Sequence, residues 1–533
     1  MRSWSFKDMV LSVRRGGGLT NWGVLVLLGW GAVCRAAPDP TQRDSLIRLE
    51  TSRQIGGTVT LTPAETKMDA RLRWMKRREM SRPAFPPAMH FFKAKPLIEK
   101  SPIFALLQKM PKGGALHIHS STLVSVDWLV SNVTYRPHCY ICFTSDRSVR
   151  FVFSAGYPWL TWDCSYWYLL ETLRAKMGDP AAFDNSLIQN LTMFTEEPDL
   201  AYPSQDVAWE KFEKKFVVAS GLITHAPVLR DYLYQGLEEL RRDNIMYLEL
   251  RSGLARTYEL DGSRHDKLWY LKTFQEATQQ FVEDHPDFLG TRIIITVHRS
   301  LSVSRVKAAV MEAIQMQSDF PDVVAGFDLV GREDRGRNLW YFKDALLLPA
   351  NLGLVLPYFF HAGETDEEGT DVDENILDAL LLNTTRIGHG YALPHHPLAK
   401  ELARAGNVAV ELCPISNQVL RLVSDLRNHP AAVLMSEGHP LVISSDDPSL
   451  FGNAGLSYDF YQAFVGIGGL KANLGTLKEL AANSIKWDIL VIQSKYSSLP
   501  PHLKEAGLLH WREKWDTFIS SNGNQSRTTK GFV

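Results

Sequence analysis

The chain has 533 residues, and its 58 Lys and Arg against 59 Asp and Glu leave a formal net charge of −1. This balance excludes a global basic field for nucleic acid or another polyanion, although it says nothing about local patches. Hydrophobic residues make up 45% and charged residues 22%, which excludes wholesale disorder and is typical of a globular protein with large buried cores.

Residues 1–37 have the pattern of a secretory signal peptide. Basic residues precede a mostly apolar segment at 21–33, and Ala36 and Ala37 supply small residues for cleavage. We therefore expect a secreted, extracellular or lysosomal protein with no membrane span after cleavage. No later segment is both long and apolar enough to cross a bilayer.

An oxidising compartment favours disulfides and glycans. One disulfide is expected within 139–164, from Cys164 to either Cys139 or Cys142. Sequons that predict surface glycosylation occur at Asn132, Asn190, Asn383 and Asn524.

The N-terminal part of the mature chain, 38–110, is predicted to be helical. A capping box at 62–65 begins a basic helix, and two shorter helices are expected at about 88–99 and 101–110. This block is too small to be stable alone, so we expect it to pack on the main domain or on another subunit. The aromatic, cysteine-bearing segment 127–190 is predicted to be an insertion in a larger scaffold.

The main domain is expected at 111–520, followed by a tail at 521–533, and from 209 onward helical stretches alternate with short apolar strands. This alternation predicts a parallel sheet of βα units. Eight strands are expected, at 114–119, 246–251, 291–299, 323–331, 356–364, 386–390, 407–414 and 441–448. Eight such strands predict an α/β fold of the TIM (β/α)8 barrel type. Each strand ends in polar residues, and in a barrel these ends meet where active sites are built.

Four of these strand-end residues form a candidate metal site. His117 and His119 are two apart on a strand, so both imidazoles face the barrel interior. His361 closes the fifth strand and Asp446 the eighth, and three imidazoles with one carboxylate suit Zn2+ with one open position. Glu364, at the exit of the fifth strand, is either a general acid or base or a carboxylate that caps a helix.

Further candidates surround this cluster. His389 lies between glycines that allow close approach of a substrate, and it is a candidate fifth ligand or base. Trp209, Phe212 and Phe216 recur at helical spacing, which indicates an amphipathic helix that packs on the core. His298 ends the third strand and is a candidate pocket residue.

Several motifs together resemble the adenosine deaminase family: HIH at 117–119, GFDLVGRED at 326–334, HAGE at 361–364, RIGHG at 386–390, ELCPISN at 411–417 and SSDDP at 444–448. The signal, the helical block and the insertion resemble its secreted branch, the adenosine deaminase growth factors. The resemblance implies hydrolytic deamination of adenosine and 2′-deoxyadenosine, together with extracellular signalling activity. It also implies a homodimer formed through the N-terminal helices. The insertion would offer a surface for a cell-surface receptor or glycosaminoglycan.

The resemblance also implies roles for individual residues. One Zn2+ per subunit would be held by His117, His119, His361 and Asp446. Glu364 would protonate the purine N1, while His389 would act as a base or steady the developing negative charge. Asp447 would bind N7, the Gly331 amide would meet N3, and Trp209 would contact the nucleoside. The resemblance also places the helix of Trp209 over the site as a hydrophobic wall or lid, as an alternative to core packing.

The sequence departs from the family at one position. An aspartate that contacts the ribose usually follows the HxH pair, and here Ser120 follows it, which offers a hydroxyl group without charge. Alternatives within related chemistry are a deaminase for AMP or an N6-modified purine, and a metallohydrolase of the amidohydrolase type. An alternative of another class is a secreted receptor ligand with the barrel as scaffold. The cytidine-deaminase type is excluded, because the chain has no H-x-E with a following P-C-x-x-C.

Overall fold

The computed structural model describes residues 39–485, 498 and 501–523. The predicted signal peptide and the sequon at Asn524 therefore lie outside the described residues. The chain forms two compact units, 1–52 and 53–533. The described part of the first unit belongs to helix α3 (Pro40–Arg53), which has no buried residues and whose last residue begins the second unit.

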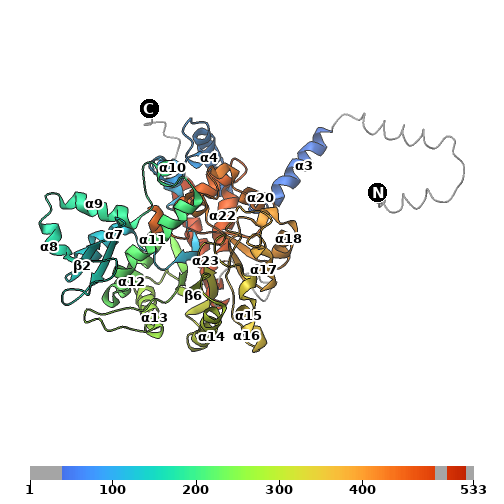
Figure 1. The fold of residues 1–533 in the computed structure, drawn as a ribbon. Helices are drawn as coiled ribbons and strands as arrows, with labels where there is room; N and C mark the ends of the chain where they lie inside the picture. Colours follow the sequence, from blue (N-terminus) through green and yellow to red (C-terminus); the bar gives the residue numbers. More distant parts are fainter. Residues whose placement is uncertain (1–38, 486–497, 499–500, 524–533) are drawn as a thin grey trace. The chain divides into compact units, whose positions relative to one another are not determined.

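The second unit contains a closed parallel barrel (Figure 1). Its strands are β1 (Gly113–His119), β5 (Ile245–Ser252), β6 (Thr291–His298), β7 (Val324–Val330), β8 (His361–Ala362), β9 (Arg386–His389), β10 (Ala409–Leu412) and β11 (Leu441–Ile443). They form two sheets, in the orders β1-β5-β6-β7 and β11-β10-β9-β8. Parallel bridges from Phe327 to Tyr358 and from Ile118 to Asp446 join the two edges. The predicted (β/α)8 fold is confirmed, with β8 much shorter than expected.

Helices follow the strands and cover the barrel. The regular ones are α12 (Ala226–Arg242), α13 (Lys267–Asp284), α14 (Val303–Asp319), α15 (Lys343–Leu346), α16 (Leu348–Asn351), α17 (Asn375–Leu381), α18 (Pro397–Ala405), α19 (Pro414–Val419), α20 (Ala431–Ser436), α21 (Ser457–Tyr461), α22 (Leu474–Asn483) and α23 (Pro501–Gly523). Short turns are η3 (Trp340–Phe342), η4 (Leu393–His395), η5 (Leu426–Asn428), η6 (Pro448–Phe451) and the π-helix η7 (Gln462–Ile467). No helix among the described residues is long and apolar enough to cross a membrane.

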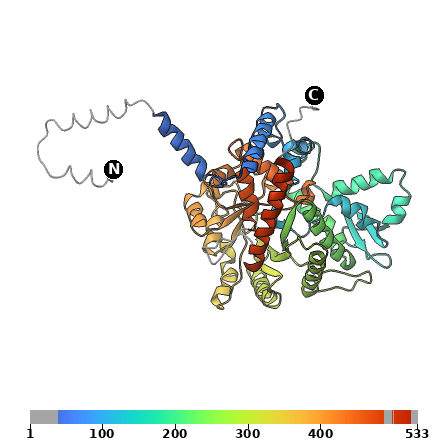
Figure 2. The same ribbon diagram turned by 180° about the vertical axis from the view of Figure 1, so that it is seen from behind.

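The N-terminal block lies against the barrel. It comprises α4 (Pro63–Met80), η1 (Pro86–Ala88), α5 (Phe91–Ile98) and α6 (Pro102–Leu107). The expected capping box is present, because the Thr62 hydroxyl accepts from the Glu65 amide and the Glu65 carboxylate accepts from the Thr62 amide. Helix α4 packs beside α22 and α23 on the outside of the barrel (Figure 2). The N-terminal block thus packs on the main domain, as expected.

The insertion between β1 and β5 is built around a small antiparallel sheet in the order β3-β2-β4. Its elements are α7 (Val126–Ser131), η2 (Val133–Tyr135), β2 (Cys139–Phe143), β3 (Val149–Phe153), β4 (Tyr168–Leu169), α8 (Leu170–Ala175), α9 (Pro180–Leu191), α10 (Pro198–Ala201) and α11 (Gln205–Ile223). Cys142 pairs with Cys164, while Cys139 is buried and free, so the expected disulfide is confirmed and its partner decided. Among the sequons, Asn132 and Asn383 are exposed and Asn190 is partly buried.

Candidate active site and metal centre

The four predicted metal ligands meet at the carboxyl-terminal end of the barrel. His117 and His119 come from β1, His361 from β8, and Asp446 follows β11; one ligand atom from each lies within 4.8 Å of the others. The Nε2 atoms of His117 and His119 lie 3.2 and 3.1 Å from Asp446 Oδ1. Strand order alone thus brings together residues that are more than 300 positions apart in the chain.

The contacts around this cluster fit a bound cation. Glu411 contacts His117 Nδ1 at 2.7 Å, and Asp328 contacts His361 Nδ1 at 2.6 Å. Each carboxylate holds a proton on Nδ1, so the Nε2 lone pair faces the cluster. His117 Nε2 is buried and has no hydrogen-bond partner, although it faces the Asp446 carboxylate. A cation among these ligand atoms would relieve the repulsion between their lone pairs, and this donor set suits Zn2+.

Two buried arginines bind the carboxylates that hold the metal-ligand histidines. The guanidinium of Arg251 donates to Asp328 at 2.9 Å and to Glu411 at 2.7 Å. Arg386 donates to the other oxygen of Glu411 and to Glu249. Burial raises the pKa of Glu411, but the two guanidinium groups outweigh it and hold that pKa well below its ordinary value. Glu411 is therefore ionised and can keep the His117 tautomer in place.

Glu364 points into the site and lacks a partner. Its backbone amide donates to Glu333 at 2.6 Å, and the Gly363 amide donates to the same carboxylate at 3.0 Å, which holds the turn after β8. The Glu364 side chain is buried and its Oε1 has no hydrogen-bond partner. Burial first, and then the charges of Asp446 and Glu333, raise the pKa of Glu364 well above its ordinary value. The helix that follows begins only at Asn375, so Glu364 does not cap it.

His389 lies beside this carboxyl group. Its Nδ1 is 3.5 Å from Glu364 Oε1, and its Nε2 is 4.0 Å from Asp446 Oδ2. Both His389 (φ 61°) and Asp446 (φ 62°) have left-handed backbones, which is rare outside glycine and clusters at functional sites. Burial lowers the pKa of His389 well below its ordinary value, so the ring is neutral.

A cavity of about 420 Å³ opens over the cluster. The four predicted substrate-binding residues all line it: Trp209, His298, Gly331 and Asp447. Helix α11 forms one wall, where Trp209 stands edge-on to Phe212 at 5.3 Å between ring centroids. Gly331 has φ 98°, a conformation that residues with a side chain rarely adopt, and a Cβ there would lie 2.3 Å from His298 Nε2.

The sequence did not single out every residue of the site. Glu213 and Thr296 also line the cavity and were not predicted, whereas Phe216 and Ser120, which the sequence analysis names, lie there as well. The supporting groups were also missed: Arg251, Asp328, Glu333, Glu411 and Asn417. Arg251, Asp328 and Glu411 lie in strand-end segments that the sequence already marks, so position at a strand exit was the available signal for them. Glu333 lies in the loop after β7, and Asn417 lies in α19.

Two family models match the chain: "Adenosine deaminase" at residues 179–497, and "Adenosine/AMP deaminase N-terminal" at 38–107. Adenosine deaminase 2-A of Danio rerio is 57% identical over 498 residues, covering 93% of this chain and 97% of the relative. Adenosine deaminase 2 of Homo sapiens is 50% identical over 482 residues, covering 90% and 93%.

Solved structures share the fold at low identity. An Arabidopsis N6-mAMP deaminase superposes with a TM-score of 0.53 at 18% identity, covering 76% of this chain and 99% of that one. An amidohydrolase from Burkholderia ambifaria with bound Zn gives a TM-score of 0.51 at 18% identity, covering 78% and 94%. The family models and the relatives, read with the site geometry, show that the chain belongs to the adenosine deaminase family and is a hydrolytic deaminase.

Proposed function

We propose that this protein is a zinc-dependent deaminase of adenosine and 2′-deoxyadenosine, which releases ammonia and the corresponding inosine. The observation that carries the proposal is the buried, unpartnered Glu364 carboxyl beside the His and Asp cluster, under a cavity with an aromatic wall. Further support comes from relatives that are named adenosine deaminase 2.

The metal would be held by His117, His119, His361 and Asp446. When bound, Zn2+ supplies Lewis acidity that lowers the pKa of water from 15.7 to about 7. Side chains and backbone groups of the protein bind the substrate and transfer protons. The oxygen of water bonds to C6, the C6–N bond breaks, and the amino group leaves as ammonia. Of the two protons of water, one goes to the leaving amino group and the other replaces the proton that N1 takes from Glu364.

Proton transfer and orientation fall to the remaining residues. The raised pKa of Glu364 keeps its carboxyl protonated, so it donates to the purine N1 and makes C6 more electrophilic. Burial and the neighbouring Asp446 raise the pKa of Asp447 to about 7, so it can donate a hydrogen bond to N7. The Gly331 amide faces N3, and Trp209 covers the base.

A neutral nucleoside fits this cavity better than AMP. Among the described residues that line it, Arg251 is the only Lys or Arg, and its guanidinium is already engaged by Asp328 and Glu411. A phosphate group would therefore find no free guanidinium or ammonium there. Ser120 offers a hydroxyl group to the sugar, which suits substrates with and without a 2′-hydroxyl.

Three assays on one preparation test the proposal. Metal analysis is expected to find about one zinc ion per chain, as the four-ligand site requires. Absorbance is expected to report conversion of adenosine and 2′-deoxyadenosine but not AMP. Chelation is expected to abolish turnover, and added zinc to restore it. Faster turnover of AMP, or full activity without metal, would contradict the proposal.

We also propose that the protein is secreted, glycosylated and homodimeric. The Cys142–Cys164 disulfide supports an oxidising compartment. Growth-factor activity and a receptor or glycosaminoglycan partner for the insertion stay predictions. Binding of the Glu364→Gln variant to cells would separate signalling from catalysis, because that change leaves the insertion intact.

A further inference from the structure

The loop between β3 and β4 carries five exposed apolar or aromatic side chains. Trp159 and Trp162 are 94% and 97% exposed, and Leu160 between them is 60% exposed. Tyr157 and Tyr166 are 55% and 53% exposed. We call these five residues the aromatic tip. Trp is normally among the more buried residue types, so a cluster this exposed marks an interaction site.

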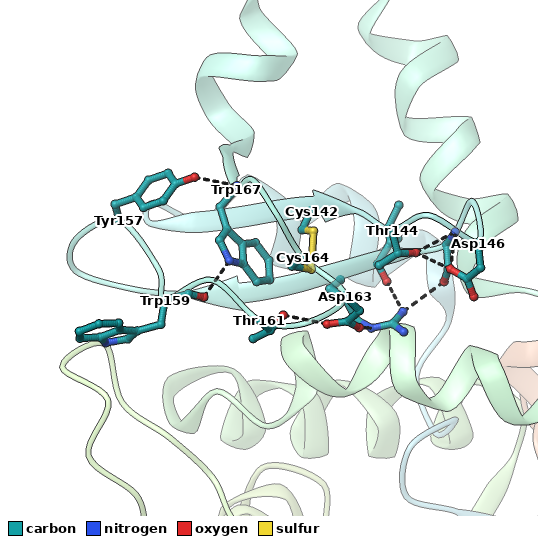
Figure 3. Close-up of a disulfide and its surroundings, with 12 residues drawn as sticks. Cys142, Thr144, Asp146, Tyr157, Trp159, Thr161, Asp163, Cys164 and Trp167 are labelled. Carbon is teal, nitrogen blue, oxygen red and sulfur yellow. Dashed lines mark hydrogen bonds and ion pairs between the residues drawn. A yellow bond between two sulfur atoms is a disulfide. The ribbon is translucent and has the colours of Figure 1, made fainter.

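A disulfide and two hydrogen bonds hold the aromatic tip in place. The disulfide from Cys142 to Cys164 closes its C-terminal side (Figure 3). Trp167 donates its indole N–H to the Trp159 carbonyl at 3.1 Å and its backbone N–H to the Tyr157 hydroxyl at 3.0 Å. A partner would therefore meet a preorganised surface, and little ordering entropy would be lost on binding.

Charge and shape decide which partner fits. Asp163 is the only charged residue between 155 and 170, and it is paired with Arg150 at 3.0 Å. The tip thus presents no net charge to a polyanion. The indole rings of Trp159 and Trp162 are almost fully exposed, so they do not line a groove. Leu160 has no polar group that could form a hydrogen bond with a sugar hydroxyl. Trp and Tyr next to aliphatic side chains are the composition favoured at the boundary between water and lipid.

We propose that the aromatic tip inserts into the interface of a phospholipid membrane and docks the enzyme there. The test compares the full mature protein with W159S/W162S and with L200S/V355S in flotation with neutral phosphatidylcholine vesicles. Leu200 and Val355 are 80% and 84% exposed but lie outside the tip, so their variant is a matched control. Turnover of adenosine in solution checks that each variant is folded.

The wild type and the control are expected to float with the vesicles, and brominated lipid is expected to quench their fluorescence. The tip variant is expected to partition into the vesicles at least about tenfold more weakly, because it lacks the two large rings that the lipid would bury. Binding should persist at about 0.5 M salt, because the tip is uncharged. Equal binding of all three proteins, or binding of the wild type to glycosaminoglycan or another glycan without binding to vesicles, would overturn the proposal.

A second inference rests on independent contacts behind His389. The Ala431 amide, which can only donate, lies 3.1 Å from His429 Nδ1. That nitrogen is therefore an acceptor, and His429 carries its proton on Nε2, which donates to Asn417 Oδ1 at 3.0 Å. The remaining side-chain group of Asn417 is its amide, which lies 3.1 Å from His389 Nδ1 and donates to it.

We infer that Asn417 and His429 are positioning residues that keep His389 neutral with its proton on Nε2, facing the reaction centre. In that tautomer His389 donates a hydrogen bond to the oxygen that adds to C6, and it does not start as a base. The chain of donors begins at a backbone N–H, so the direction of every bond in it is determined. The catalytic consequence rests on the proposed function, whereas the tautomer does not.

Nitrogen NMR of 15N-histidine-labelled, metal-free protein reads the tautomer directly, with His389→Gln to assign the signal. The Nε2–H form is expected in the wild type, and protonation of Nδ1 in Asn417→Asp. His429→Phe is expected to lower kcat about 100-fold with little change in KM, and His429→Gln, which keeps a donor, to recover most of it. An Nδ1–H signal in the wild type, or unchanged kcat in His429→Phe, would overturn the inference.

Discussion

At the scale of single residues, the site depends on one carboxyl group that folding leaves without a partner. Glu364 is buried against Asp446 and Glu333, and its backbone is held while its Oε1 stays free. A buried carboxyl without a partner costs stability. That cost has a function when the group must be a protonated acid at neutral pH.

Glu364→Gln is expected to retain zinc and lose activity by about 10³-fold, because the amide has the same shape but no acidic proton to give. Zinc content and adenosine turnover measured on one preparation check this. Ser424→Ala, which removes a hydroxyl outside the cavity lining, is the control. Full turnover by the zinc-loaded Gln variant would disprove the role of Glu364.

The pKa of Glu364 also predicts the pH dependence. Burial and Asp446 raise that pKa, so the active, protonated form predominates below it and is lost as pH rises through it. We expect kcat for adenosine to fall on the alkaline side, approaching tenfold per pH unit. A kcat that stays constant over the alkaline range in which the enzyme remains folded would contradict this assignment.

At the scale of elements, α11 forms a wall of the cavity as well as packing on the core. Trp209 and Phe212 are buried and also line the cavity, and Phe212 stacks on Phe451 beyond the wall. Helix α11 therefore does both things that were expected of it: its aromatic side chains pack on the core, and they also line the cavity.

Trp209→Ala is expected to raise KM for adenosine roughly tenfold while changing kcat little, since apolar contact is lost equally in the ground and transition states. Steady-state kinetics measure this. Trp340→Ala removes a partly exposed indole outside the cavity and should leave KM unchanged. A pure loss of kcat in Trp209→Ala would instead place this ring in the chemical step.

At the scale of the whole molecule, the N-terminal helices are part of the barrel unit. Lys76 of α4 is buried, and its ammonium group donates to three carbonyls of the segment that includes η7: Phe464, Gly469 and Ala472. A chain that began at Pro111 would lack Lys76 together with Phe91 and Phe104, and the core residues that these rings cover would become exposed. Point substitutions are therefore a cleaner test of the predicted dimer than truncation.

Lys76→Met is expected to lower the free energy of unfolding by roughly 3 kcal/mol, because it keeps the apolar stem but removes the donor that three carbonyls share. Denaturant titration followed by tryptophan fluorescence measures this. Lys93→Met, at a half-exposed position on α5 with only surface ion pairs, should change stability by less than about 1 kcal/mol. Equal effects of the two variants would show that Lys76 does not anchor α4.

The positions of the site residues were predictable because they depend on local periodicity, whereas their chemical roles were expected from the resemblance to the family. Residues two apart on a strand share a face, and this rule alone places His117 and His119 together. The barrel then collects His361 and Asp446 at the same end, since all parallel strands end there. The same logic indicated Glu364 and His389, whose side chains the structure places beside the cluster.

Contacts between distant positions could not be derived in this way. Arg251 reaches Glu411 across 160 positions, and Asn417 meets both His389 and His429, because barrel closure decides which side chains face one another. The choice of Cys142 over Cys139 likewise depends on which side of β2 faces the loop. Strand and helix periods are properties of the backbone, so the sequence by itself determined which residues lie on the same face and at the same strand ends. The pairings between distant side chains exist only once the strands have closed into a barrel. Only the tertiary structure therefore decided how the residues that the sequence identifies are oriented.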